Sequence, residues 1–162
     1  MQPQIVPEPQ KSRYLVCVDQ HEESKVALRL ACMKANARGS QVVMVHVIAP
    51  ADFQTLGAIA DRMREERKRE GQKLLNDLAE EAFATYGIRP VTALREGSTG
   101  DEILETILAD VNINIVVIGT TQHGAGRGKL TSWLATQLGS KLLVPLLMVP
   151  GNLTDQQLHA LI

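Results

Sequence analysis

Short apolar runs of strand length alternate with helical patterns along this chain, and this alternation restricts its fold more than any other feature. The runs YLVCV (14–18) and VVMVHVI (42–48) are apolar at nearly every position, as in strands that parallel sheets bury on both faces. Between them, apolar residues recur with a period near 3.6, which predicts a helix over 24–39 that Ser24 caps and Gly39 ends. The two strands are therefore predicted to be parallel neighbours.

The same alternation continues to the end of the chain. A helix is predicted to begin at Ser98 or Thr99 and to bury a stripe of Ile103, Ile107 and Val111. Strands and helices in this order predict an α/β fold, a single-domain open parallel sheet with helices on both faces. The further predicted strands are 90–94, 114–119 and 142–149, and the further predicted helices are 59–85 and 132–140, the first of them ended by Gly87.

The predicted domain covers 13–150. Three prolines fall within the first twelve residues, which predicts that 1–12 is a disordered tail. The segment 151–162 is predicted to form a short C-terminal helix, because Thr154 can cap it and Gln157 stands three residues later.

Composition excludes several classes of function. The 162 residues are 44% hydrophobic and 22% charged, with a net charge of −1, which argues against a general nucleic-acid or membrane binder. The charged run 61–70 alternates in sign and is interpreted as the solvated face of a helix. Cys17 and Cys32 lie within apolar patterns, which favours free buried thiols in a reducing, cytoplasmic location.

Two strand ends carry residues suited to binding a ligand, and open parallel sheets bind ligands at this edge. Asp19 follows the first strand, where it can accept hydrogen bonds from a ribose or an adenine amine, or can simply serve as a turn residue. Gly119 ends the fourth strand and leads into the glycine-rich stretch IGTTQHGAGRGKLTSW. There Thr131 and Ser132 can add hydroxyl groups at a helix N-terminus, where anions are favoured.

No standard phosphate-binding loop or catalytic set is present in the sequence. A Walker-type loop needs a hydroxyl residue after Gly128-Lys129, and Leu130 occupies that position. A metal pair formed by His21 and His123 lacks a third ligand, and no nucleophile–base pair shares one strand end. The sequence therefore favours a binding protein over an enzyme, with slow hydrolysis of a bound nucleotide left open.

Five stretches in the same order resemble the universal stress protein family over residues 13–150. They are YLVCVDQHEES, VVMVHVIAP, LREGSTGDEILETI, NINIVVIGTTQHG and VPLLMVP. The resemblance implies a Rossmann-like fold of the adenine nucleotide alpha hydrolase-like type, with five parallel strands in the order 3-2-1-4-5. That order places the first and fourth strands side by side, at the edge where Asp19 and Gly119 stand.

Family members that bind ATP resemble one another in a motif of Gly, two residues, Gly, nine residues, Gly and then Ser or Thr. Aligned on Gly119, this chain has Gln122, Ser132 and Trp133 at the other three positions. A one-residue shift places Thr131-Ser132 on the Gly-Ser pair and restores only the hydroxyl. The phosphate-binding motif is thus degenerate.

The positions that the resemblance assigns to adenine agree better. Asp19 matches, and Val47 after His46 matches the family's His-Val pair. The resemblance therefore implies an adenine nucleotide, with ATP, ADP and AMP left open, bound as a regulatory ligand in a stress response. The predicted binding residues are Val18, Asp19, Val47, Ile118, Gly119, Gly124, Gly126, Thr131 and Ser132.

A rival hypothesis is a nucleotide-free interaction module of the same family. Under both hypotheses we expect a homodimer, because the strand 142–149 is apolar at nearly every position and lies at the sheet edge in the family's order. Neither hypothesis involves a nucleic acid or a membrane.

Overall fold

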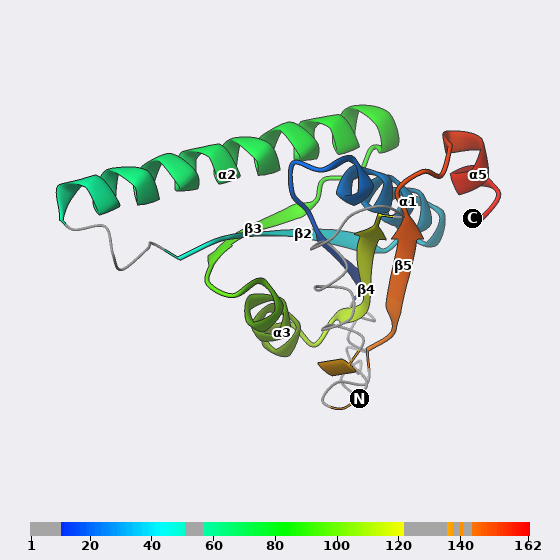
Figure 1. Ribbon diagram of the computed structural model, residues 1–162. Helices are drawn as coiled ribbons and strands as arrows, with labels where there is room; N and C mark the ends of the chain where they lie inside the picture. The colour runs from blue at the N-terminus through cyan, green and yellow to red at the C-terminus, as the bar shows by residue number, and fades with distance from the viewer. Residues whose placement is uncertain (1–10, 51–56, 122–135, 138–139, 141–143) are drawn as a thin grey trace, which may run out of the picture.

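The computed structural model describes residues 11–50, 57–121, 136–137, 140 and 144–162, and all structural statements below concern these residues. Five parallel strands form one sheet in the order β3-β2-β1-β4-β5, so the predicted α/β fold and strand order are confirmed (Figure 1). The strands are β1 (Arg13–Cys17), β2 (Gln41–Ile48), β3 (Val91–Glu96), β4 (Ile113–Thr120) and β5 (Leu146–Pro150). The helices are α1 (Glu22–Arg38), α2 (Ala58–Tyr86), α3 (Thr99–Ala109) and α5 (Asp155–His159).

Helices cover both faces of the sheet, which explains the continuous apolar runs in its strands. Residues that alternate along one strand enter two separate cores: Tyr14 and Val16 of β1 pack with α1 and α2, whereas Leu15 packs with α3. Figure 1 shows α2 and α3 on opposite sides of the sheet. In the part of the chain that the structure describes, no helix is both long and apolar enough to cross a membrane.

The start of α1 differs from the prediction, whereas its end agrees. Gly39 ends the helix in the left-handed conformation, with φ of 66°. At the other end the N-cap is His21 and the helix begins at Glu22, so the prediction that Ser24 caps it was wrong. Ser24 lies within the first turn and is buried. Its hydroxyl group bonds to the turn that precedes the helix instead of capping the helix.

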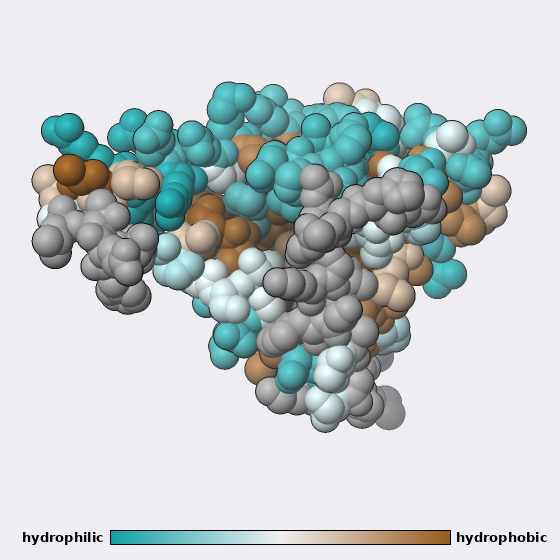
Figure 2. Space-filling model, in the orientation of Figure 1, coloured by the Kyte–Doolittle hydropathy of each residue, from teal (hydrophilic) through white to brown (hydrophobic). Residues whose placement is uncertain are grey.

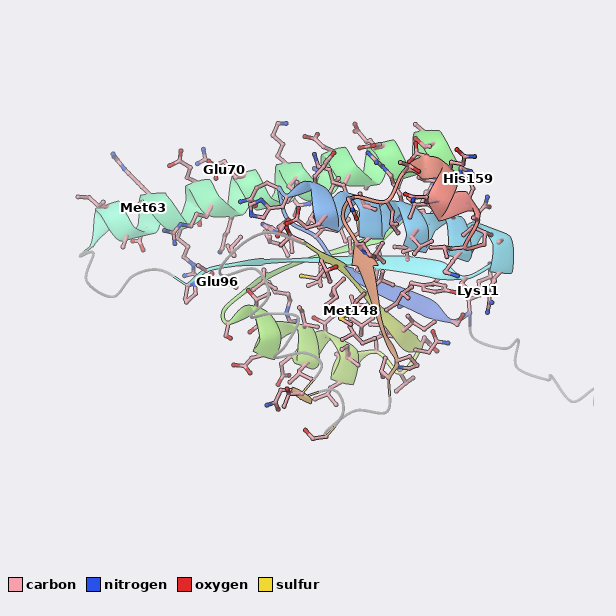
Figure 3. The ribbon with its side chains drawn as sticks, turned by 45° about the vertical axis from the view of Figure 1, so that its right-hand side comes forward. Lys11, Met63, Glu70, Glu96, Met148 and His159 are labelled. Atoms are coloured by element: carbon pink, nitrogen blue, oxygen red, sulfur yellow. The ribbon has the colours of Figure 1, made fainter. Side chains whose placement is uncertain are left out.

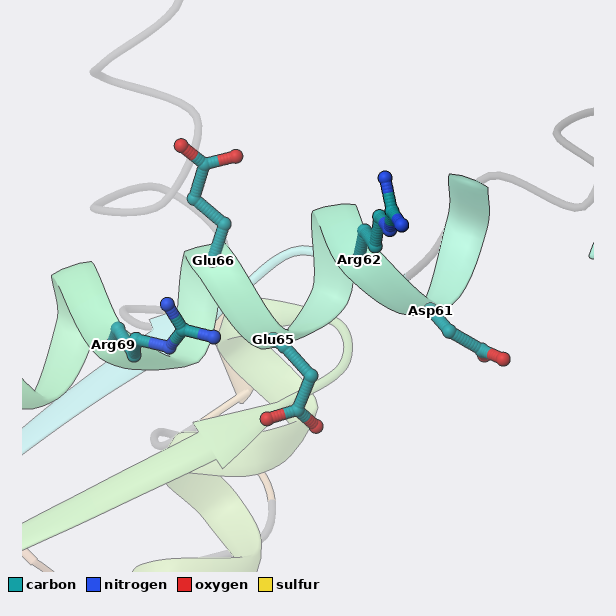
Figure 4. A pocket seen from close by; sticks show the side chains of 5 residues that line it. All are labelled: Asp61, Arg62, Glu65, Glu66 and Arg69. Atoms are coloured by element: carbon teal, nitrogen blue, oxygen red, sulfur yellow. The ribbon is translucent and has the colours of Figure 1, made fainter. Parts of the chain in front are cut away.

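The helix α2 covers the sheet only with its second half. Its buried residues are Gly71, Leu75, Leu78 and Ala82, while the charged run 61–70 is mostly exposed, as predicted. Figure 2 shows hydrophilic residues along the outer surface that α2 forms. In its first half, a shallow pocket is lined by Asp61, Arg62, Glu65, Glu66 and Arg69, and Figure 4 shows Glu65 and Glu66 extending to opposite sides of the helix.

The helix α3 is shorter than its apolar stripe predicted. Ser98 is its N-cap, and Ile103 and Ile107 are buried as expected. Val111 is 88% exposed, so its predicted burial was wrong. The helix ends at Ala109 because Asp110 adopts an extended conformation and forms an ion pair with Arg13 of β1, with 2.6 Å between Nη1 and Oδ2.

Both ends of the domain are attached to the sheet or to α1. The predicted tail 1–12 lies largely outside the described residues, but the carbonyl oxygen of Ser12 accepts a hydrogen bond from Gln41 N. At the other end, the predicted capping box between Thr154 and Gln157 is present in α5, and the side chain of Leu158 is fully buried. Lys34 of α1 donates to the Leu161 carbonyl oxygen at 2.9 Å.

The strand β5 begins later than predicted. The apolar run predicted a strand over 142–149, but β5 starts at Leu146, and Val144 and Pro145 precede it without strand structure. Residues 141–143 and most of the predicted helix 132–140 lie outside the described residues.

Candidate functional site

The carboxyl ends of β1 and β4 lie side by side, where the strand order reverses. Val16 of β1 pairs with Val117 of β4, so Asp19 and Gly119 emerge at the same edge of the sheet. β1 leads into α1 and then β2 on one side, while β4 and β5 lie on the other. This is the crevice in which open α/β sheets bind their ligands.

Asp19 is held in a tight turn between β1 and α1. Its Oδ1 accepts a hydrogen bond from His21 N at 2.8 Å, and its own N–H donates to Ser24 Oγ at 3.1 Å. The Ser24 hydroxyl hydrogen reaches the carbonyl oxygen of Asp19 or of His21, each at 3.0 Å. Asp19 is therefore a turn residue, as the simpler interpretation held, and its Oδ2 forms no hydrogen bond or ion pair with a described residue. A half-buried carboxylate with one fixed oxygen can still accept hydrogen bonds from a ligand through the other.

Val18 and Ile118 lie beneath the candidate site rather than in it. Their side chains are 1% and 3% exposed and belong to the two cores on opposite faces of the sheet. The N–H of Val18 donates to Val45 O, and its carbonyl oxygen accepts from His46 Nδ1 at 2.7 Å. The half-buried His46 thus has a structural hydrogen bond. Val18 and Ile118 support the site by packing, and in Val18 both backbone groups already have protein partners.

Gly119 has a packing role that the sequence did not suggest. A Cβ atom at this position would lie 2.0 Å from Glu23 O and 2.9 Å from Ser24 N, both backbone atoms in the first turn of α1. Gly151, at the end of β5, is similarly close, since a Cβ there would lie 2.6 Å from Glu23 Cβ. The two glycines let α1 start directly against β4 and β5. The first glycine of the phosphate motif is thus needed for the fold, whether or not a phosphate binds.

The N-terminus of α1 is not a free anion site. Glu22 and Glu23 occupy its first turn, where carboxylates offset the positive end of the helix dipole. Any phosphate at this edge must therefore be held by other groups. The candidate residues are Gly124, Gly126, Thr131 and Ser132, which lie outside the described residues together with Gln122, His123 and Trp133.

Val47 lies on the α3 side of the sheet edge, beside a pair of charges that the sequence analysis did not identify. Its side chain is half-buried and packs in the same core as Cys17. In the sheet register Val47 pairs with Arg95 of β3, whose Nε donates to Glu102 Oε2 at 2.8 Å. The sequence gives one signal for this pair of charges, an arginine at a strand end in LREG. It does not show that Arg95 lies beside Val47 of the neighbouring strand β2.

Cys17 is not an activated nucleophile. Burial, with a smaller effect from the nearby Asp19 carboxylate, raises the pKa of the Cys17 thiol to about 12. Burial likewise raises the pKa of Cys32 to about 12, so both thiols stay protonated at neutral pH. Among the described residues, no group of three or more His, Cys, Asp or Glu residues is arranged to hold a metal ion.

A family model described as the universal stress protein family matches residues 12–150. The chain belongs to this family. Its fold is also that of solved family members, among them a protein from Burkholderia pseudomallei with 20% identity, covering 89% of this chain and 99% of the other, at a TM-score of 0.69.

Two similar structures of this family contain an adenine nucleotide. One is the universal stress protein from Archaeoglobus fulgidus in complex with dAMP (18% identity, 86% and 97% coverage, TM-score 0.62). The other is an Arabidopsis thaliana protein with AMP bound (13% identity, 89% and 94% coverage, TM-score 0.60). At these identities the likeness concerns the fold. No curated protein matches the sequence.

Within this universal stress protein, the described part of the site divides into two kinds of residue. Asp19 and Val47 are half-buried at the carboxyl edge of the sheet, whereas Val18 and Ile118 are buried in the two cores and Gly119 lies against the first turn of α1. The first glycine of the family's motif, Gly119, is therefore present and serves packing. The other three motif positions, which the resemblance assigns to phosphate, are replaced in this sequence.

Proposed function

We propose that this universal stress protein binds an adenine nucleotide as a regulatory ligand at the carboxyl edge between β1 and β4. The observation that carries the proposal is the Asp19 carboxylate, which a turn fixes at the switch point while leaving Oδ2 without a partner among the described residues. Relatives of the same fold that hold AMP and dAMP support it.

In the proposed complex the adenosine lies over Val47 and beside Asp19, on the α3 side of the edge. Asp19 Oδ2 accepts a hydrogen bond from the ribose or from the adenine amine. The phosphates extend from Gly119 towards Gly124, Gly126, Thr131 and Ser132. ATP, ADP and AMP all fit this arrangement, because it is the adenosine portion that meets the described residues.

The proposed role is regulatory and cytoplasmic, without dedicated turnover. The thiol nearest the site, Cys17, is protonated at neutral pH, and its neighbour Asp19 is engaged in the turn. A bound nucleotide would therefore act through the conformation or the surface that it stabilises. Slow hydrolysis is compatible with this role.

Mass spectrometry of small molecules released from purified, full-length protein tests the proposal directly. We expect an adenine nucleotide in the released fraction, or binding of added ATP, ADP or AMP at millimolar concentration or below. Protein that releases no nucleotide and binds none of the three would contradict the proposal.

A second candidate function is a homodimeric interaction module without nucleotide. The observation that favours a dimer is Met148, which is 50% exposed on the edge strand β5 beside the half-buried Leu146 and Leu147 (Figure 3). An apolar edge strand is a surface that a second copy can cover. Sedimentation should give a dimer at micromolar concentration and a shift towards monomer for Met148→Glu. A monomeric parent protein excludes this dimer.

A further inference from the structure

A second groove opens at the sheet edge, on the face that α2 covers. Its volume is about 590 Å³, and it lies between the end of β2, Gln20 and the middle of α2. Ile48, Ala49 and Leu74 line it with apolar side chains. Its polar groups belong to Gln20, His46, Arg67 and Glu70. Val47, which we assign to the nucleotide, belongs to the core on the other face. The groove therefore shares no lining residue with the proposed nucleotide site, although its Gln20 follows Asp19 directly in the chain.

Gly71 brings α2 into direct contact with the sheet beside this groove. A Cβ at this position would lie 2.8 Å from Leu94 Cδ1 and 3.1 Å from His46 Cδ2. Glycine is among the least favourable residues inside a helix, so its place in the middle of α2 has a packing reason. The His46 ring is consequently held between β2 and α2.

The tautomer of the neutral His46 ring follows from its partner. Nδ1 lies 2.7 Å from the Val18 carbonyl oxygen, which can only accept a hydrogen bond, so Nδ1 carries the proton. In the neutral ring Nε2 is then a hydrogen-bond acceptor. No described residue bonds to Nε2, and His46 is one of the residues that line the groove.

Arg67 is a half-buried cation without an ion-pair partner among the described residues. The other half-buried arginines of the described chain, Arg13, Arg29 and Arg95, each lie within 4.0 Å of a carboxylate oxygen. Arg67 forms no ion pair with any described residue. A guanidinium that is partly removed from water and unpaired is a favourable partner for an anionic group of a ligand.

Glu70 adds a negative charge to the groove from the same helix, three residues after Arg67. Figure 3 labels Glu70 on α2. Glu70 too has no ion-pair partner among the described residues. One cation and one anion, with the neutral amide of Gln20, give the groove no formal net charge, which disfavours a polyanion such as a nucleotide phosphate. A ligand with both charges can pair with both charged side chains of the groove.

We propose that this groove binds a small zwitterion with an apolar side chain, of the free amino acid class. Its carboxylate contacts Arg67, its ammonium lies between Glu70 and His46 Nε2, and its side chain covers Ile48 and Leu74. This site does not depend on the proposed nucleotide function.

Three matched probes test the proposal by calorimetry or NMR titration of the full chain. They are L-leucine, 4-methylpentanoate, which lacks the amine, and 3-methylbutylamine, which lacks the carboxylate. We expect leucine to bind more tightly than either analogue, and to do so equally with or without added AMP. Absence of leucine binding at millimolar concentration, or tighter binding of inorganic phosphate, overturns the proposal.

Two variants of α2 test the proposed contacts, and a third is their control. Arg67→Gln should weaken leucine binding about tenfold or more, as expected for the loss of a charge-assisted hydrogen bond. Glu70→Gln should remove the preference for leucine over 4-methylpentanoate. Arg69→Gln, an exposed neighbour outside the groove, should change nothing. Equal losses from Arg67→Gln and Arg69→Gln would show a general charge effect and overturn the assignment.

Discussion

Substitution of Gly119 by alanine distinguishes packing from ligand binding at the end of β4. The added Cβ would lie 2.0 Å from Glu23 O and 2.3 Å from Glu23 C, where an ordinary contact needs at least 3.4 Å. Both atoms are backbone, so no side-chain rotation relieves the clash. Either α1 or β4 must move by more than an ångström, and the fully buried Ala27 and Ala31 hold α1 against the sheet core.

The expected loss of stability follows from this geometry. Overpacking a core typically costs 1–3 kcal/mol, and we expect about 3 kcal/mol or more here because the obstacle is backbone. For a chain of this size, that corresponds to a fall in Tm of roughly 6–12 °C. Urea and thermal unfolding of nucleotide-free protein measure it.

Gly39→Ala is the matched control, because Gly39 has φ of 66° and no atom within 4 Å of the added Cβ. It should lose only about 1–2 kcal/mol, the cost of the left-handed conformation. If Gly119→Ala proves no less stable than Gly39→Ala and only nucleotide binding is lost, the packing argument is wrong.

Three further changes test other contacts. Ser24→Ala removes the hydroxyl that holds the Asp19 turn and should cost about 1–3 kcal/mol in urea unfolding, and it should also weaken nucleotide binding in calorimetry. Leu158→Ala empties a fully buried position and should lower the free energy of unfolding by about 2–5 kcal/mol, whereas an unchanged value would mean that α5 is not docked. Burial opposes ionisation of Asp110, but hydrogen bonds from Asn112 and Arg13 outweigh it and lower its pKa. The stability that Asp110 contributes should therefore be present above its unfolded pKa and disappear as the pH falls through its folded pKa. Urea unfolding of Asp110→Asn across the acid range should show this part of the pH dependence missing.

Continuous apolar runs and glycine stops are local signals, so the sequence predicted the elements along the chain, whereas the order of the strands in the sheet came from the resemblance to the family. Gly39 and Gly87 end their helices as predicted. The errors come from contacts between distant residues. The start of β5 was placed too early because an apolar run does not show where pairing with β4 begins. The end of α3 depends on an ion pair between Arg13 and Asp110, which are 97 residues apart.

The candidate site shows the same division. Asp19 could be identified from the sequence because it follows a buried strand at the switch point. The sequence allowed Asp19 to be a turn residue, and its hydrogen bond from the His21 N–H agrees with that. The hydrogen bond from the Asp19 N–H to the Ser24 hydroxyl was not predicted, since a serine near a helix start first suggests a cap. The contact between Gly119 and Glu23 links β4 to α1, and no local pattern distinguishes such a glycine from a phosphate-binding one.

Calorimetric titration of ATP, ADP and AMP into the parent protein and Asp19→Asn tests the central claim most directly. Asparagine retains an oxygen that can accept the His21 N–H, so the turn and the fold should persist, with Asp61→Asn on the exposed part of α2 as control. We predict that the parent binds at least one of the three nucleotides. Asp19→Asn should weaken that binding by about tenfold or more, since a charged hydrogen bond contributes roughly 1.5–3 kcal/mol. A parent protein that binds none of them at millimolar concentration, or an Asp19→Asn variant that binds as tightly as Asp61→Asn, would contradict the account.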